Sequence, residues 1–272
     1  MRATPRTRST SSPFRAAALI AVAAMCATGA RAAGVEAYEG EAYSANGERL
    51  LYRESHWLFD EEGGSTRVVL YRCANGQPFA RKHVHASASA QAPDFELTDA
   101  RSGYREGVRS AASGRSVFVR SGGDVAQRSA ALELGDAAVV DAGFDAFVRT
   151  HWGALADGRA LPIEFVVPSR LAALSFSVRR VGDDTEDGRL LRTFRLALAS
   201  WYGRWLPHVD VAYDVSSRTL RRYRGISNLR DAQGRNLDVR IEFPPAARTD
   251  AATQADVDAA LRAPLVAACD RD

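Results

Sequence analysis

The stretch TRVVLYRCANGQPFARKHVH, residues 66–85, predicts a β-hairpin. Residues 66–73 are rich in β-branched and aromatic residues and are expected to form a strand. Its expected buried face carries Val69, Tyr71 and Cys73. Asn75 and Gly76 follow, and this dipeptide favours a type I′ turn because both residues tolerate a positive φ. A second extended segment over residues 79–85 completes the hairpin.

Apolar and polar residues alternate in several segments of the second half of the chain. One strand is expected at residues 174–178, an acidic turn at 182–188, and a further strand at 194–198. The C-terminal third predicts a meander of strands at residues 209–213, 220–226 and 237–243, with turns between them and Pro244-Pro245 at its end. Alternation of Asp238, Arg240 and Glu242 with apolar residues indicates a sheet with one solvated face. The pattern is that of a mainly β protein.

Two segments follow a helical period instead. The first helix is expected to end at Gly158, and its apolar residues have the spacing i, i+3, i+4, i+7, i+8, i+11: Phe144, Phe147, Val148, His151, Trp152 and Leu155. A short second helix is expected at residues 254–262, with Thr253 as its N-cap. We therefore predict an α+β fold, a curved antiparallel sheet or open half-barrel packed against one central amphipathic helix, with a short C-terminal helix.

The first 32 residues have the parts of a secretory signal peptide. They are rich in arginine, carry an uncharged Ala-rich run at residues 16–27, and end on Ala30-Arg31-Ala32. Cleavage near Ala32/Ala33 would leave residues 33–272 as a single periplasmic domain, with possible halves 33–158 and 159–246. The apolar run is shorter than the roughly 20 residues that span a bilayer, so no transmembrane segment is expected in the mature chain. A mitochondrial transit peptide and a lipoprotein acylated at Cys26 are the alternatives.

The charge balance argues against a nucleic-acid partner. The chain carries a net charge of +3, but residues 1–32 contain five arginines and no acidic residue, which leaves −2 for the rest. The remaining arginines are interleaved with Asp and Glu rather than clustered on one stripe. Lys82 is the one lysine of the chain.

Two cysteines remain after the expected cleavage, Cys73 and Cys269. In an oxidising compartment an even pair favours a disulfide, which would tie the C-terminal tail to an early strand. The alternative is a pair of free thiols, one buried in a strand and one in the tail.

No catalytic motif stands out. The sequence lacks a Gly-x-Ser-x-Gly elbow and a His-Glu-x-x-His helix. His83 and His85 share one strand face at a spacing that can hold a metal, and His56 could be a third ligand from an adjacent strand. Arg81 shares that face and would repel a cation, so it is more simply read as the solvent side of the hairpin. We expect no metal, no cofactor and no catalytic residue.

Aromatic side chains concentrate in the predicted helix and in the segment 200–207. Large aromatic residues beside arginines suit a rim that contacts lipid, because the Trp side chain combines a large apolar ring system with a polar N–H group. The expected lining or lid of a ligand site consists of Phe144, Phe147, Trp152, Trp201 and Trp205. The alternative is ordinary core packing of a helix on a curved sheet.

The meander carries short motifs that allow a comparison: Tyr213-Asp214, Arg222-Tyr223-Arg224-Gly225, Asp231-Ala232-Gln233-Gly234 and Val239-Arg240-Ile241-Glu242-Phe243. With these, the segment 209–243 resembles the C-terminal part of uncharacterised exported proteins of Gram-negative bacteria. The wider strand-and-helix pattern is similar to the curved-sheet fold of the periplasmic lipoprotein carriers. That resemblance implies an open sheet wrapped around a helix, with an apolar concavity that in the carriers holds acyl chains. It assigns no residue a role.

These observations favour a non-enzymatic protein that binds an apolar or amphipathic envelope ligand, such as a lipid or acyl chain. A protein-interaction module in envelope assembly is the first alternative, and it would use sheet edges or an exposed aromatic patch. A hydrolase or metal-dependent enzyme built from residues distant in sequence is the second. A deep apolar cavity would favour ligand binding.

Overall fold

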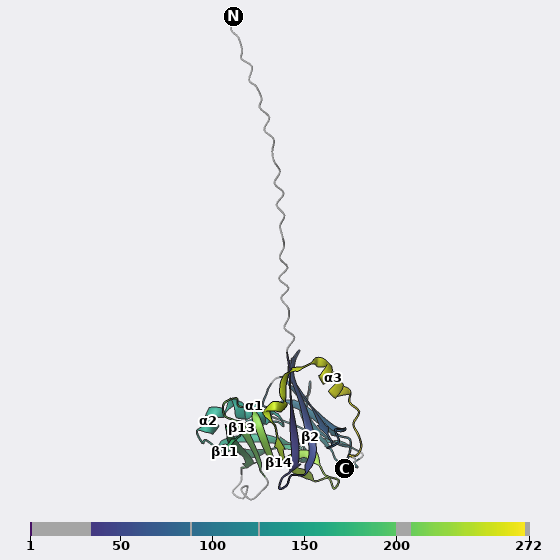
Figure 1. Cartoon of the computed structure of the whole chain (residues 1–272). Coiled ribbons are helices and arrows are strands. Elements are labelled where there is room, and N and C mark those ends of the chain that lie inside the picture. Colours follow the sequence, from purple (N-terminus) through teal and green to yellow (C-terminus); the bar gives the residue numbers. More distant parts are fainter. Residues whose placement is uncertain (2–33, 88, 125, 200–207, 270–272) are drawn as a thin grey trace. The chain divides into compact units, whose positions relative to one another are not determined.

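One continuous curved sheet dominates the fold (Figure 1). The computed structural model describes residues 1, 34–87, 89–124, 126–199 and 208–269. The predicted leader after Met1 lies outside the described residues, as do Trp201 and Trp205. The sheet has sixteen strands in the order β8-β7-β6-β5-β4-β3-β2-β1-β15-β14-β13-β12-β11-β10-β9, and β16 pairs with β1 beside this path.

Two meanders make up the sheet. The strands of the first are β1 (Val35–Ser44), β2 (Leu50–Glu61), β3 (Gly64–Arg72), β4 (Pro78–Ala86), β5 (Asp94–Asp99), β6 (Tyr104–Ala111), β7 (Gly114–Arg120) and β8 (Arg128–Ala131). Those that follow are β9 (Ala138–Val139), β10 (Leu161–Val167), β11 (Ala172–Glu186), β12 (Arg189–Leu198), β13 (Val209–Asp214), β14 (Leu220–Arg230), β15 (Asn236–Glu242) and β16 (Arg248–Ala252). Every pair is antiparallel except β9 with β10. The predicted fold class is confirmed.

Strand β1 joins the two meanders. It pairs with β2 along one side and with β15 along the other, where Ala42 lies opposite Ile241. The sheet then curls, so that the 3-10 turn Pro168–Arg170 after β10 contacts β6 and β7. A second contact joins the two meanders: the amide of Val140, just after β9, donates to the carbonyl of Gln91, between β4 and β5, at 2.9 Å. The large buried cluster inside this curve includes Tyr52, Phe79, Leu97 and Val239.

The hairpin predicted from residues 66–85 is present as β3 and β4. Its turn differs from the prediction, because Gly76 has φ +88° while Asn75 is not among the residues with positive φ. The loop closes with the Cys73 amide donating to the Gln77 carbonyl at 2.8 Å, so it is longer than a two-residue turn. A two-residue turn occurs instead between β11 and β12, where Asp187 and Gly188 have φ of +51° and +73°.

The expected acidic turn at residues 182–188 is therefore mostly strand. Asp183 accepts two hydrogen bonds from each of two arginines, Arg180 and Arg192, at 2.7–3.0 Å. Bonding to Arg192, with that to Arg180, lowers the pKa of Asp183 to about 2. Neutralisation of the acidic side chains lets the two strands remain paired to the end of the hairpin.

The predicted central helix is divided in two. α1 (Gly143–Thr150) and α2 (Trp152–Ala156) meet at His151, whose φ of −99° and ψ of 16° are not helical. Both segments bury their apolar side against β10 to β13, and Trp152 contacts the rings of Phe194 and Tyr213 edge-on. Helical hydrogen bonds still span the junction, from the His151 amide to the Phe147 carbonyl and from the Leu155 amide to the His151 carbonyl, both at 3.0 Å.

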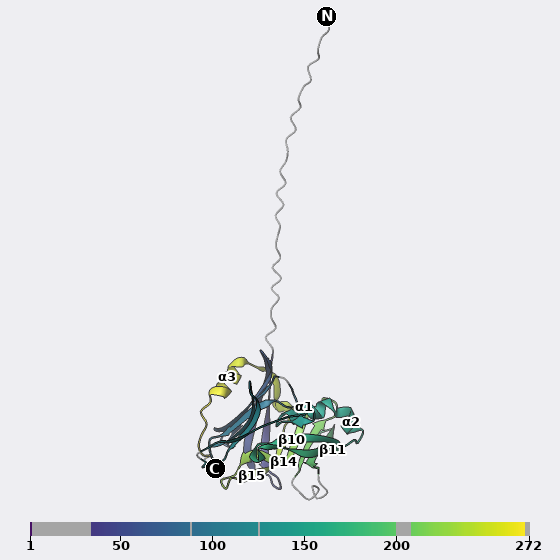
Figure 2. The ribbon, with the colours of Figure 1, turned by 180° about the vertical axis from the view of Figure 1, so that it is seen from behind.

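The C-terminal helix agrees with the prediction. α3 (Gln254–Arg262) begins after Thr253, whose side chain accepts from the Asp256 amide in a capping box. It covers the outer face of the first meander, where Val257 and Ala260 pack on Val68 and Leu70. Figures 1 and 2 show α3 on a different side of the sheet from α1 and α2.

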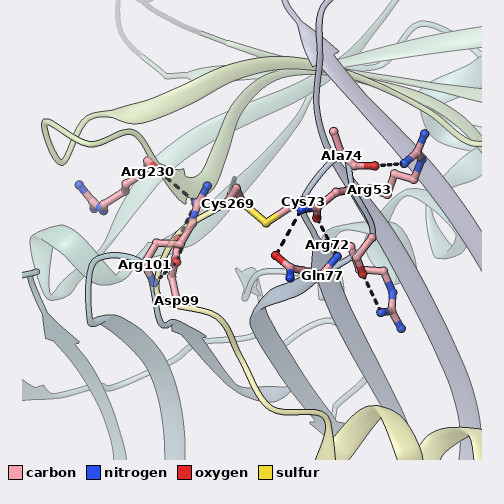
Figure 3. The surroundings of a disulfide bond; sticks show 11 residues. Arg53, Arg72, Cys73, Ala74, Gln77, Asp99, Arg101, Arg230 and Cys269 are labelled. Carbon is pink, nitrogen blue, oxygen red and sulfur yellow. Dashed lines mark hydrogen bonds and ion pairs between the residues drawn. A yellow bond between two sulfur atoms is a disulfide. The ribbon is translucent and has the colours of Figure 1, made fainter. Parts of the chain in front are cut away.

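A disulfide joins Cys73, after β3, to Cys269 (Figure 3). Its Cα atoms are 5.6 Å apart, within the usual range for a disulfide. Nearby, the Arg101 guanidinium binds the buried Asp99 carboxylate and the carbonyl of Arg230. The tail between α3 and the disulfide is also held by the Val266 amide, which donates to the Pro78 carbonyl at 2.8 Å.

No helix among the described residues has both the length and the apolar character needed to cross a membrane.

Candidate functional site

A cavity of about 450 Å³ lies inside the curve of the sheet. Its volume falls in the range of roughly 300–1,000 Å³ found for small-molecule sites. Strands of both meanders and α1 line it. Three of the lining residues are exposed and mark where the cavity opens to solvent: Ser169, Ile226 and Asn236.

Strand register explains why polar groups gather at one end of this cavity. Residues directly opposite one another in neighbouring strands point to the same face of a sheet. One such row crosses six strands of the first meander, and it consists of Tyr38, His56, Val69, Lys82, Leu97 and Glu106. Four members of this row line the cavity with polar side chains: Tyr38, His56, Lys82 and Glu106.

Lys82 is paired with Asp141 inside the cavity. Its Nζ lies 2.8 Å from Asp141 Oδ1 and 3.1 Å from Oδ2. Burial lowers the pKa of Lys82, but the Asp141 carboxylate outweighs burial and holds that pKa above its usual value. Asp141 adopts φ +43°, in the left-handed region that non-glycine residues rarely occupy. The pair therefore fixes the segment just before α1 to the centre of the first meander.

A second set of hydrogen bonds continues from this pair. Asn228 Nδ2 donates to Asp141 Oδ1 at 3.1 Å and to Glu106 Oε1 at 2.6 Å. The Tyr104 hydroxyl donates to the other oxygen of Glu106 at 2.6 Å and accepts from Arg230 at 2.9 Å. Asn228 reaches these partners because the register of β14 shifts between Ile226 and Arg230. Such irregularities often redirect a side chain beside a functional site.

The stability that Glu106 contributes should fall as pH rises. Burial, the largest cause, raises the pKa of Glu106 above its usual value. A carboxyl whose folded pKa is raised stabilises the protein below its unfolded pKa, about 4.3 for Glu, and loses that effect as pH passes the folded value. The free energy of unfolding of the wild type, minus that of Glu106→Gln, is expected to decrease over this window. Urea titrations of both proteins across the pH range measure it, and a flat or rising difference contradicts the assignment.

His56 and Tyr38 form the edge of the polar end. Their rings stack at a centroid distance of 4.4 Å. His56 Nε2 lies 3.0 Å from Glu54 Oε2, whereas its buried Nδ1 has no partner among the described residues. Burial lowers the pKa of His56, so the imidazole is neutral near pH 7, with Nε2–H as the donor to Glu54.

The opposite wall of the cavity is apolar and comes mainly from the second meander. Phe165 and Phe176 contact each other edge to face at 5.8 Å. The remaining apolar lining of this wall includes Val166, Val167, Leu196, Val209, Val211 and Leu220. The cavity is thus amphipathic, with charged groups on one side and aliphatic and aromatic groups on the other.

The structure separates the aromatic residues that the sequence grouped together. Phe144 lines the cavity and lies edge-on to Phe165 at 6.4 Å. Phe147 and Trp152 are buried in the cluster beneath α1 and α2 and are not among the cavity-lining residues. Trp201 and Trp205 lie outside the described residues.

The three histidines considered as metal ligands do not meet. His56 faces the cavity, whereas His83 lies opposite Val68, whose side chain packs beneath α3 on the outer face. His85 approaches Thr66 and Glu61, also away from the cavity. Within the described ranges, no group of three or more His, Cys, Asp or Glu side chains is arranged to hold a metal ion.

Sequence reasoning missed the charged lining, although a signal for it was present. Lys82 alternates with Ala80 and Val84, and Arg67 precedes Val69 and Tyr71 at the same spacing. A charged residue in register with buried apolar ones indicates a polar group directed into the interior.

No protein-family model matches the chain, and no curated protein matches it. Among solved structures, the chain is similar to a β-barrel-like protein of domain of unknown function DUF1849 from Brucella abortus. The two share 9% sequence identity over 78% of this chain and 96% of the other, with a TM-score of 0.48.

Proposed function

We propose that this protein is exported through its N-terminal leader and binds an amphipathic envelope ligand, one that carries an acyl chain, in the cavity. The amphipathic lining is the observation that carries the proposal: Phe165, Phe176 and Val211 offer an apolar wall, and the row through His56 and Lys82 offers polar partners. Apolar burial supplies about 0.8 kcal/mol per methylene, so a chain along this wall would supply most of the affinity. Polar groups at the other end would fix its orientation.

Filling the apolar wall should abolish binding. Val211→Phe on β13 adds a ring where the cavity wall is now a small side chain, and it is expected to reduce ligand occupancy at least tenfold. Ser175→Phe on β11 is the matched control, because Ser175 is exposed and does not line the cavity. Overpacking costs about 1–3 kcal/mol, so a thermal melt must show that Val211→Phe remains folded.

The measurement is native mass spectrometry of protein purified from the cell envelope, followed by mass spectrometry of its organic extract. Wild type and Ser175→Phe are expected to carry a lipid that folded Val211→Phe lacks. The intact mass also reports whether the chain begins near Ala33, as the leader predicts. Protein without ligand in every sample would contradict the binding function. Equal ligand occupancy in wild type, Ser175→Phe and Val211→Phe would show that the ligand binds outside this cavity.

A further inference from the structure

Arg67 is a charged residue of the cavity wall for which the described residues supply no hydrogen-bond acceptor. It lies on β3 opposite Leu58 and Val84, one position along the inner face from the row that holds His56 and Lys82. Its Nη2 approaches Asp145 Oδ2 of α1 at 3.9 Å, too far for a hydrogen bond. The described residues accept no hydrogen bond from its five N–H groups.

Each of the other charged groups of the cavity has at least one partner among the described residues, although Asp145 Oδ1 and Arg230 Nε are buried without one. Lys82 is bound to Asp141, and Arg230 donates to Tyr104 and to the carbonyl of Gly234. The carboxylates likewise meet donors or cations: Glu54 meets His56, Glu106 meets Tyr104 and Asn228, Asp141 meets Lys82 and Asn228, and Asp145 meets Arg149. Ion pairing at Asp145 is shared, since Arg149 Nε lies closer, at 3.2 Å. Arg67 and Arg149 therefore share the one Asp145 carboxylate.

Two uncharged groups with free hydrogen-bonding capacity line the same cavity, the Tyr38 hydroxyl and His56 Nδ1. The Tyr38 hydroxyl has no hydrogen-bond partner among the described residues, and the Tyr38 ring stacks on His56. The Arg67 side chain is 20% exposed, so its N–H groups are open to a ligand, and an anionic oxygen pair matches the planar guanidinium fork. Phe144, which lines the cavity one residue before Asp145, marks where the apolar wall begins.

We propose that Arg67 binds the anionic end group of the ligand, a carboxylate or a phosphate monoester, through paired N–H donors, with the Tyr38 hydroxyl as a further donor. The acyl chain then extends along Phe165 and Phe176. This inference rests on the proposed function and names its ligand class: a single-chain anionic amphiphile rather than a neutral or cationic one.

Three probes with the same sixteen-carbon alkyl chain separate anion binding by Arg67 from acyl-chain binding itself. They are palmitate, hexadecyl phosphate and the neutral hexadecanol. We expect the wild type to bind at least one anionic probe about 10- to 100-fold more tightly than the alcohol, as charge-assisted hydrogen bonds predict. The preferred anion identifies the end group. Arg67→Met should lose this preference while keeping its affinity for hexadecanol.

The control is Arg72→Met, which removes the same charge from the same strand where Arg72 bonds the carbonyl of Gly76 and does not line the cavity. It should retain the preference for the anion. Isothermal titration calorimetry gives the dissociation constants, and a thermal melt verifies folding of each variant. Equal binding of alcohol and anions by the wild type would overturn the role of Arg67 and leave the proposed function intact. An anion preference that survives in Arg67→Met would also overturn it, whereas binding of none of the probes would count against acyl-chain binding itself.

Discussion

Reduction of the Cys73–Cys269 disulfide is expected to lower the free energy of unfolding by roughly 3–5 kcal/mol. The two cysteines are 196 residues apart in sequence, so the bond removes much conformational freedom from the unfolded chain. It also holds the tail that follows α3, and this helix covers Val68 and Leu70. Loss of the bond should therefore loosen the outer face of the first meander as well.

Urea unfolding with and without dithiothreitol measures this effect. Cys269→Ala should unfold at the midpoint of the reduced wild type, and dithiothreitol should change it no further. Hydrogen exchange should quicken first in α3, where the carbonyls of Ala260 and of Ala263, the residue that follows the helix, accept from Arg81 in the intact protein. A wild type whose midpoint is insensitive to reduction would show that α3 and the tail are held by packing alone.

The second large effect is expected from Lys82→Met, which should destabilise the protein by about 3–5 kcal/mol. The substitution leaves the Asp141 carboxylate buried without its counter-charge. Among the described residues, Asn228 alone would still donate to it, at 3.1 Å. Because Asp141 is 59 residues away on the segment before α1, its release should also affect the docking of that helix.

A double variant separates the lost charge balance from lost packing. Lys82→Met combined with Asp141→Asn should be more stable than Lys82→Met alone, since no unpaired charge remains. Asn also tolerates the left-handed backbone that Asp141 adopts at φ +43°. Arg235→Met, which breaks an exposed pair with Asp231, is the control and should cost at most about 1 kcal/mol. A double variant no more stable than the single one would mean that the pair contributes little beyond packing.

Local patterns predicted the strands and the C-terminal helix because these depend on neighbours in sequence. Thr253 caps α3 where expected, and the meander at residues 209–243 has the predicted strand order. The joining of the two meanders could not be predicted, because the pairing of β1 with β15 brings together residues about two hundred positions apart. Turn types were also misjudged: Asp187-Gly188, not Asn75-Gly76, has two residues of positive φ.

The cavity was harder to predict than the fold. The concentration of aromatic residues in the predicted helix pointed to Phe147 and Trp152 as lining residues. Both belong to the hydrophobic core instead, because the two short helices need bulky side chains against β12 and β13. The polar end of the cavity depends on the register of six neighbouring strands. The apolar pattern within one strand does not reveal which residues of another strand lie opposite it. Arg67 and Lys82 were nevertheless visible as charges in phase with buried neighbours.

The position of β1 has a consequence for how the chain folds. β1 is among the first segments of the sheet in sequence, and one of its partners, β15, is nearly the last. Until β15 arrives, the first meander has an unpaired edge at β1, and such edges promote association between chains. Completing the sheet is a non-local step of high contact order, which makes folding slow. A chain whose final strands are not yet available would therefore present an unpaired strand edge, which a chaperone could cover.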